Sequence, residues 1–180
     1  MAIAQTIPLL ESILTLWKET IGADYLAYKN HVYRMLHFCL YLHEASADER
    51  QKLTISAAFH DIGIWSDNTV DYLPPSIAQA KVYLRANGLD PSNREIELVI
   101  DMHHKLRRYR DDGTYPLVEI FRRGDLVDFS LGAVTFGIPK TYISEVKAAF
   151  PNAGFHRRLL QLSWRQLKRH PLNPAPMMKW

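Results

Sequence analysis

Residues 46–63 read Ser-Ala-Asp-Glu-Arg-Gln-Lys-Leu-Thr-Ile-Ser-Ala-Ala-Phe-His-Asp-Ile-Gly, a stretch that holds both the start and the end of a helix. Ser46 and Glu49 have the spacing of a capping box, in which the two side chains satisfy backbone N–H groups at a helix N-terminus. Apolar residues then follow at helical spacing, and Gly63 ends the pattern. His60 and Asp61 therefore fall in the last turn of the predicted helix.

The same signals recur along the chain and predict an all-α protein. We find no alternation of period two that is long enough for a strand. We therefore expect one compact helical domain at residues 1–170, followed by a Pro-rich tail at 171–180. Residues 64–75 contain two prolines and are predicted to form a loop that borders a substrate site. The other predicted helices are Leu9–Glu19, Asp24–Glu44, Ser76–Asn87, a helix from Asp90 that buries Ile96, Val99, Ile100, His103 and Leu106, one from Pro116 through Asp128, Pro139–Phe150 and Phe155–His170.

The amino-acid composition excludes several classes of protein and of metal site. A chain of 180 residues that is 47% hydrophobic and 23% charged can bury a core, which excludes a disordered or fibrous protein. Its single cysteine, Cys39, can form neither an internal disulfide nor a thiolate cage, so a metal would need histidine and carboxylate ligands. The uncharged run Phe129–Pro139 is shorter than the about 20 residues that span a bilayer, and Met1–Leu10 has no basic leader. We expect a cytoplasmic protein without a membrane partner.

Positive charge is concentrated near the C-terminus. The net charge is +3, yet residues 155–180 hold six Lys and Arg and no acidic residue. A helix with such a face could meet nucleic acid or another anionic surface. Because no nucleic-acid motif accompanies it, we favour a solvated helix face and do not expect nucleic acid as a partner. The charges on this helix are Arg157, Arg158, Arg165, Lys168 and Arg169.

Four residues from separate segments could form a metal site: His31, the pair His60-Asp61, and Asp125. Each alone is more often an ordinary structural residue. Together, two imidazoles and two carboxylates can hold Mn, Fe, Co, Ni, Zn or Mg, and the ligand types do not choose among these ions. His60 and Asp61 are neighbours, so they share an ion only if it lies between their two directions.

The motifs around these residues resemble those of the HD-domain superfamily, whose members are mostly metal-dependent phosphohydrolases. The resemblance covers residues 24–131, with the motifs in the family's order. It rests on the opening His31-Val-Tyr-Arg34, the central Ala57-Ala58-Phe59-His60-Asp61-Ile62-Gly63, the Ile100-Asp-Met-His103-His104 element and the closing Gly124-Asp125-Leu-Val-Asp128.

The resemblance implies that His31, His60, Asp61 and Asp125 are metal ligands. It also implies that Asp128 supports them one helical turn later, so we name Asp61 and Asp128 as catalytic. The chain departs from relatives that bind two ions, because those relatives carry two further histidines well apart in sequence. Here only His103 and His104 occur, and a helix would point adjacent side chains about 100° apart. We therefore predict a single ion.

The expected reaction is attack of a metal-activated water on a small phosphorylated metabolite or nucleotide. In favourable zinc sites the pKa of the bound water falls from 15.7 to about 7. Arg34 is the first candidate to neutralise phosphate charge, as a catalytic and substrate-binding residue. His103 is expected to line the pocket. Lys105 could bind substrate with Arg107 and Arg108, although ordinary surface charge is the favoured explanation for these three residues. For the general acid, the sequence does not choose among Asp67, Asp71 and Glu44.

Two alternatives stay open. The chain could be a regulatory module that binds a metal or a nucleotide without cleaving it, and the basic C-terminal helix is compatible with this. It could also be a di-iron oxygenase on the same scaffold, although the missing pair of spaced histidines argues against two ions. The sequence does not determine whether the chain forms a homo-oligomer.

Overall fold

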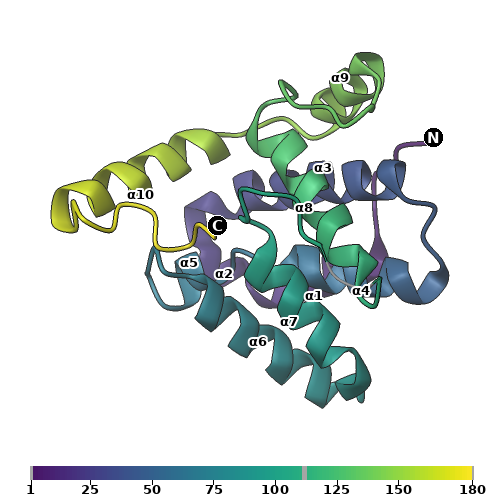
Figure 1. The fold of residues 1–180 in the computed structure, drawn as a ribbon, viewed down its shortest axis with the longest axis horizontal. Helices are drawn as coiled ribbons and strands as arrows, with labels where there is room; N and C mark the ends of the chain where they lie inside the picture. The colour runs from purple at the N-terminus through teal and green to yellow at the C-terminus, as the bar shows by residue number, and fades with distance from the viewer. Residues whose placement is uncertain (1, 111–112, 180) are drawn as a thin grey trace.

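The computed structural model describes residues 2–110 and 113–179, and these residues form helices and loops without a strand (Figure 1). The predicted all-α class is confirmed, whereas membership of the HD type stays a prediction. No helix in the described ranges is long and apolar enough to cross a membrane. In chain order the helices are α1 (Pro8–Leu16), α2 (Lys18–Ile21), α3 (Tyr25–Leu42), α4 (Ala47–Phe59), α5 (Gly63–Ser66), α6 (Leu73–Ala86), α7 (Asn93–Met102), α8 (Pro116–Phe129), α9 (Lys140–Ala149) and α10 (Phe155–Arg169), with 3-10 turns at Gly22–Asp24 and Asp90–Ser92.

The centre of the fold is the pair α3 and α8, which cross at close range. α3 has no glycine or proline in its interior, and most of its side chains are buried. Gly124 of α8 makes the close crossing possible, because a β-carbon there would meet the Sγ atom of Cys39 and the carbonyl oxygen of Met35. This crossing brings His31 of α3 next to the end of α8.

The capping box at the start of α4 forms as predicted. Glu49 N–H donates to Ser46 Oγ (3.3 Å), and Ser46 N–H donates to the Glu49 carboxylate (2.7 Å). The helix ends at Phe59, slightly earlier than expected. His60 and Asp61 therefore lie in the turn that follows α4 and not within its last regular turn.

The predicted loop at 64–75 is shorter than expected. α5 occupies Gly63–Ser66, and α6 begins at Leu73 and not at Ser76. Two prolines open α6, where a missing backbone N–H removes no intrahelical bond. The hydroxyl of Ser76 accepts a bond from the Gly63 N–H (2.9 Å) and so joins α6 to the start of α5. The prediction that Leu106 is buried was also wrong: its side chain is 52% exposed because α7 ends at Met102.

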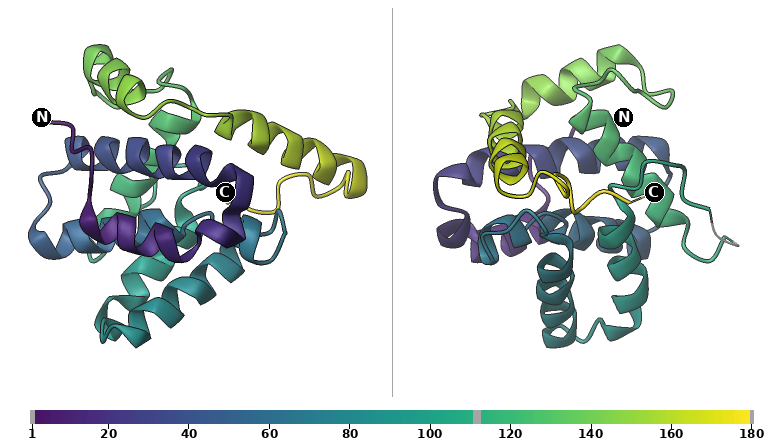
Figure 2. Two further views of the ribbon diagram at one scale, coloured as in Figure 1. Left: turned by 180° about the vertical axis from the view of Figure 1, so that it is seen from behind. Right: turned by 60° about the vertical axis from the view of Figure 1, so that its left-hand side comes forward.

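The C-terminal part of the chain covers one side of the molecule. α9 and α10 lie along this side, opposite α6 and α7, and α10 extends beyond its neighbours (Figures 1 and 2). The tail then returns to the end of α7, where Leu106 N–H donates to the Lys179 carbonyl (2.8 Å). On α10, Arg158 pairs with Asp24 (2.9 Å). The other basic side chains of this helix are exposed, namely Arg157, Arg165, Lys168 and Arg169.

Candidate metal centre

His60 and Asp61 lie at a corner where the chain leaves α4 and enters α5. A bond from Ile62 N–H to the Phe59 carbonyl (3.1 Å) closes the corner. Gly63 lets the corner pack tightly, because a β-carbon at this position would collide with the backbone at the start of α6. Since the chain turns here, the adjacent side chains reach a common point, and His60 Nε2 lies 3.2 Å from Asp61 Oδ2.

His60 and His103 are oriented in the same way, by a hydrogen bond to a backbone carbonyl three residues earlier. His60 Nδ1 donates to Ala57 O (2.8 Å), and His103 Nδ1 donates to Ile100 O (2.7 Å). A carbonyl oxygen can only accept, so the proton of each neutral ring is fixed on Nδ1 and the lone pair on Nε2. Both rings are buried, and both Nε2 atoms face Asp61, that of His103 at 3.5 Å from Oδ1.

His31 reaches the same point from α3 and is held by Asp128 of α8. Its Nδ1 donates to Asp128 Oδ2 (2.7 Å), and its Nε2 lies 3.0 Å from Nε2 of His60. Arg34, one turn later on α3, donates from Nε and Nη2 to the Asp128 carboxylate and from Nη1 to the Phe150 carbonyl (3.0 Å). The guanidinium is buried, and its bonds hold the Asp128 carboxylate in the position from which it orients His31. Contact between Arg34 and a substrate stays a prediction.

Asp125 completes the set from α8, with Oδ1 3.5 Å from His31 Nε2. One turn of α8 thus supplies two carboxylates. That of Asp125 faces the centre, and that of Asp128 orients the His31 ring. All the residues that face the centre are buried. We call these five residues the buried His/Asp group: His31, His60, Asp61, His103 and Asp125.

Within this group, His31, His60 and Asp61 each offer one ligand atom within 4.8 Å of the others, and these separations fit a divalent cation. Two ligand atoms about 2.1 Å from one ion are about 3.0 Å apart at right angles and about 3.4 Å apart at the tetrahedral angle. From His31 Nε2, the distance is 3.0 Å to His60 Nε2 and 3.8 Å to Asp61 Oδ2. Among the described residues, Asp61 Oδ1 and His103 Nε2 are buried and have no hydrogen-bond partner, which is rare in native proteins. A cation between them would satisfy both atoms, so these residues could hold a metal ion.

A second set of ligand atoms shares Asp61. Asp61, His103 and His104 each offer one atom within 4.8 Å of the others. The expectation that adjacent histidines point well apart assumed a helix through both, but α7 ends at Met102 and the two ring centroids are 4.0 Å apart. His104 Nε2 also contacts the Tyr72 hydroxyl. The number of ions stays a prediction.

The electrostatics of the buried His/Asp group favour a positive charge at its centre. Burial acts to raise the pKa of Asp61, but His60 and His103 hold it well below its usual value. Burial raises the pKa of Asp125, and the neighbouring histidines offset this only in part. Burial acts to lower the pKa of His60, but Asp61 and Asp125 raise it to about 9. A proton on this ring takes the place that a metal cation would fill.

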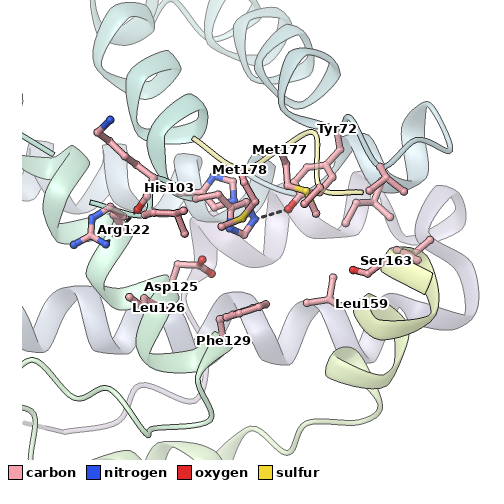
Figure 3. A pocket seen from close by; sticks show the side chains of 17 residues that line it. Tyr72, His103, Arg122, Asp125, Leu126, Phe129, Leu159, Ser163, Met177 and Met178 are labelled. Carbon is pink, nitrogen blue, oxygen red and sulfur yellow. Dashed lines mark hydrogen bonds between the residues drawn. The ribbon is translucent and has the colours of Figure 1, made fainter. Parts of the chain in front are cut away.

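A cavity of about 280 Å³ opens beside the group, and His103 and Asp125 line it (Figure 3). Lys105, which was predicted to bind substrate, lines the same cavity, as does Arg122. The guanidinium of Arg122 donates twice to Glu119 at 2.8 Å, and Glu119 also accepts a bond from Arg123 (2.8 Å). The cavity therefore joins the predicted metal ligands to two of the predicted substrate-binding residues, His103 and Lys105.

Two features of the site escaped the sequence analysis. His103 was expected only to line the pocket, yet its Nε2 atom, which has no hydrogen-bond partner, faces Asp61. The spacing of Ile100 and His103 shows that Nδ1 can donate to the Ile100 carbonyl. It does not show where Nε2 points. The C-terminal tail adds Met177 and Met178 to the cavity wall. No local pattern indicates this second contact, because it joins segments that are distant in sequence.

Comparisons of the chain with protein-family models, with curated proteins and with solved structures found no match. The family resemblance inferred from the motifs therefore stays a prediction.

Proposed function

We propose that the chain is a metal-dependent phosphohydrolase that cleaves a small phosphate ester with one divalent cation held by the buried His/Asp group. The observation that carries the proposal is that His31, His60 and Asp61 bring ligand atoms within 4.8 Å of one another beside a cavity. Asp125 lies 3.5 Å from His31 Nε2, and His103 Nε2 lies 3.5 Å from Asp61. Such nitrogen and oxygen donors suit Mn, Fe, Co, Ni, Zn or Mg. The motif resemblance to the HD-domain superfamily supports the same reaction.

A divalent cation at this site supplies Lewis acidity, both to a water molecule and to a phosphoryl oxygen. The reaction adds water across the ester: the water oxygen bonds to phosphorus, the P–O bond to the organic group breaks, and a proton goes to the leaving oxygen. The products are an alcohol and inorganic phosphate. Asp128 and Arg34 keep His31 oriented throughout, and Lys105, which lines the cavity, would neutralise phosphoryl charge.

The test combines elemental analysis with phosphate release from a panel of esters in the presence of added Mn, Co, Ni or Mg. Asp61→Asn removes a ligand, so we expect loss of bound metal and at least a 100-fold fall in turnover. Asp48→Asn is the matched control, because Asp48 is exposed at the start of α4 and forms a surface ion pair with Lys52. Turnover that persists in metal-free Asp61→Asn protein contradicts the proposal.

One observation favours a second candidate, the di-iron oxygenase. Asp61 is shared by two sets of ligand atoms, as a carboxylate between two ions would be. Two irons per chain together with oxygen uptake, and no phosphate release from any ester, would support the oxygenase over the phosphohydrolase.

A further inference from the structure

The wall of the cavity beside the buried His/Asp group is polar at one end and apolar over most of the rest. Arg122, His103 and Asp125 gather at one end, whereas Leu159 lies toward the other (Figure 3). Tyr72 and His104 are hydrogen-bonded to each other, and the remaining polar side chains among the described lining residues are Lys105 and Ser163. The apolar side chains come from several elements and include Leu126, Phe129, Leu159, Leu162, Met177 and Met178.

The charge along this wall suits one phosphate group. Its charged side chains among the described residues are Lys105, Arg122 and Asp125, and Arg122 shares the Glu119 carboxylate with Arg123. Nucleoside di- and triphosphates carry more negative charge, and their binding sites commonly use several Arg or Lys side chains with charge-assisted hydrogen bonds. A phosphate monoester carries about −1.5 to −2 near neutral pH. A divalent cation together with Lys105 and Arg122 supplies the positive charge that would face such a group.

The apolar part of the wall is unsuited to a nucleoside. A base and a ribose carry hydroxyl, amino and carbonyl groups that lose hydrogen bonds to water when they enter an apolar site. The cavity volume of about 280 Å³ is also slightly below the roughly 300–1,000 Å³ that is typical of ligand pockets. An alkyl chain or an aromatic ring, by contrast, gains from burial against leucine, phenylalanine and methionine side chains.

The folded chain holds this apolar wall in place. On α10, Leu159 faces the cavity while the adjacent Leu160 is 72% exposed, so the helix turns a specific apolar face inward. The tail is fixed by the bond between Leu106 N–H and the Lys179 carbonyl and by an ion pair from Lys179 Nζ to Asp101 (2.9 Å). The methionines of the tail are thus held over the cavity.

From these observations we propose that the cavity receives the organic group of an apolar phosphate monoester, an alkyl or aryl phosphate, in preference to a nucleotide. The inference rests on the proposed function, and it names the substrate class of the same site. The phosphate lies at the end formed by His103, Asp125 and Lys105, and the alkyl or aryl group extends toward α10 and the tail.

The first experiment compares kcat/KM for hexyl phosphate and phenyl phosphate with that for AMP and ribose 5-phosphate, with added Mn, Co, Ni or Mg. We expect at least a tenfold preference for the two apolar esters. From methyl to hexyl phosphate, each methylene that enters the cavity should raise kcat/KM by up to about fourfold.

The second experiment uses neighbouring residues of α10. Leu159→Ala and Leu162→Ala shorten side chains that line the cavity, so the ratio of kcat/KM for hexyl over methyl phosphate should fall at least fivefold. Leu160→Ala removes an exposed leucine of the same helix that is not part of the cavity wall, and should leave the ratio unchanged. Equal ratios in all three variants would overturn the inference.

Calorimetry with hexylphosphonate, which cannot be hydrolysed, separates the substrate class from the reaction. Binding that Leu159→Ala weakens, without phosphate release from any ester, supports the apolar ligand class and overturns the proposed function. Hydrolysis of AMP that is as efficient as that of hexyl phosphate leaves the proposed function standing and overturns the ligand class. If hexylphosphonate does not bind and no apolar ester is preferred, the inference is also overturned.

Discussion

Asp128 accepts hydrogen bonds from two residues of α3 through one carboxylate. Its Oδ2 takes a bond from His31 Nδ1, and both of its oxygens take bonds from Arg34. Burial acts to raise the pKa of Asp128, but His31 and Arg34 hold it well below its usual value. The carboxylate is therefore ionised at neutral pH and fixes the direction in which His31 Nε2 points.

Replacing Asp128 with asparagine should weaken metal binding while every predicted ligand stays in place. Loss of a carboxylate that orients a metal-binding histidine typically lowers affinity by about 10–100-fold. The change also leaves the buried Arg34 charge unpaired, so we expect the free energy of unfolding to fall by about 3–5 kcal/mol. Chelator competition and urea unfolding measure the two effects.

The variant Arg34→Lys separates the effect on metal affinity from the effect on stability. It keeps a positive charge beside Asp128, but it removes the guanidinium group that donates to both carboxylate oxygens. A measurable fall in metal affinity in this variant, with Asp48→Asn unchanged, fits a role of Arg34 in positioning His31. If Asp128→Asn and Arg34→Lys both bind metal as tightly as the original chain, the proposed bracing of His31 is wrong.

At the scale of elements, the α3–α8 crossing depends on the absence of a side chain at Gly124. A methyl group there would press on Cys39 Sγ, and it would lie 3.0 Å from the Cys39 nitrogen and from the Met35 carbonyl oxygen. Gly124→Ala should therefore lower the free energy of unfolding by about 2 kcal/mol, although alanine is intrinsically favoured over glycine in a helix by about 1 kcal/mol. Denaturant unfolding tests this value.

The double variant Cys39→Ala with Gly124→Ala is the control for this explanation. Removing Sγ relieves the side-chain part of the collision, so it should recover part of the lost stability. If the double variant is less stable than the sum of the two single changes, close contact with Cys39 does not explain the effect.

The capping box of α4 should give the protein a specific pH dependence. Bonds from Ser46 and His43 lower the pKa of Glu49 from 4.5 to about 2. The folded-state pKa lies below the unfolded one, so the stabilisation is complete above about pH 4.5 and is lost as the pH falls toward 2. We expect Glu49→Gln to cost about 1 kcal/mol at pH 7 and much less at pH 2. A cost that is equal at both pH values in urea unfolding would contradict this.

Local signals predicted the helices well and their exact ends less well. The Ser46–Glu49 box marked the start of α4 correctly, because capping is decided by residues three positions apart. The start of α6 was misplaced, because Ser76 has the composition of a cap but its hydroxyl bonds to Gly63 in another element. That choice between partners depends on the tertiary structure, which the local pattern does not contain.

At the scale of the whole molecule, the order of the motifs predicted which segments would meet. His31, His60, Asp61 and Asp125 were expected together, and the structure places them together from α3, the α4–α5 corner and α8. The bracing by Arg34 and the cavity wall formed by the tail were not predicted. Both depend on which face of a helix turns inward after distant segments have packed.

Because the buried His/Asp group exists only in the folded chain, a bound cation should stabilise the whole fold. An ion present at 100 times its dissociation constant adds about 2.7 kcal/mol to the free energy of unfolding. We expect the urea midpoint to rise with the concentration of the ion that binds, and to stay constant in Asp61→Asn. A midpoint that does not respond to Mn, Fe, Co, Ni, Zn or Mg argues against a metal in this group.

The distance along the chain between His31 and Asp128, 97 positions, has a consequence for biosynthesis. A nascent chain that has exposed α3 and α4 already carries His31, His60 and Asp61, but α8, with Asp125 and the brace for His31, has not yet emerged from the ribosome. Metal loading would then be a late event, after α8 has docked. The species that chaperones and proteases meet first would therefore be the metal-free chain.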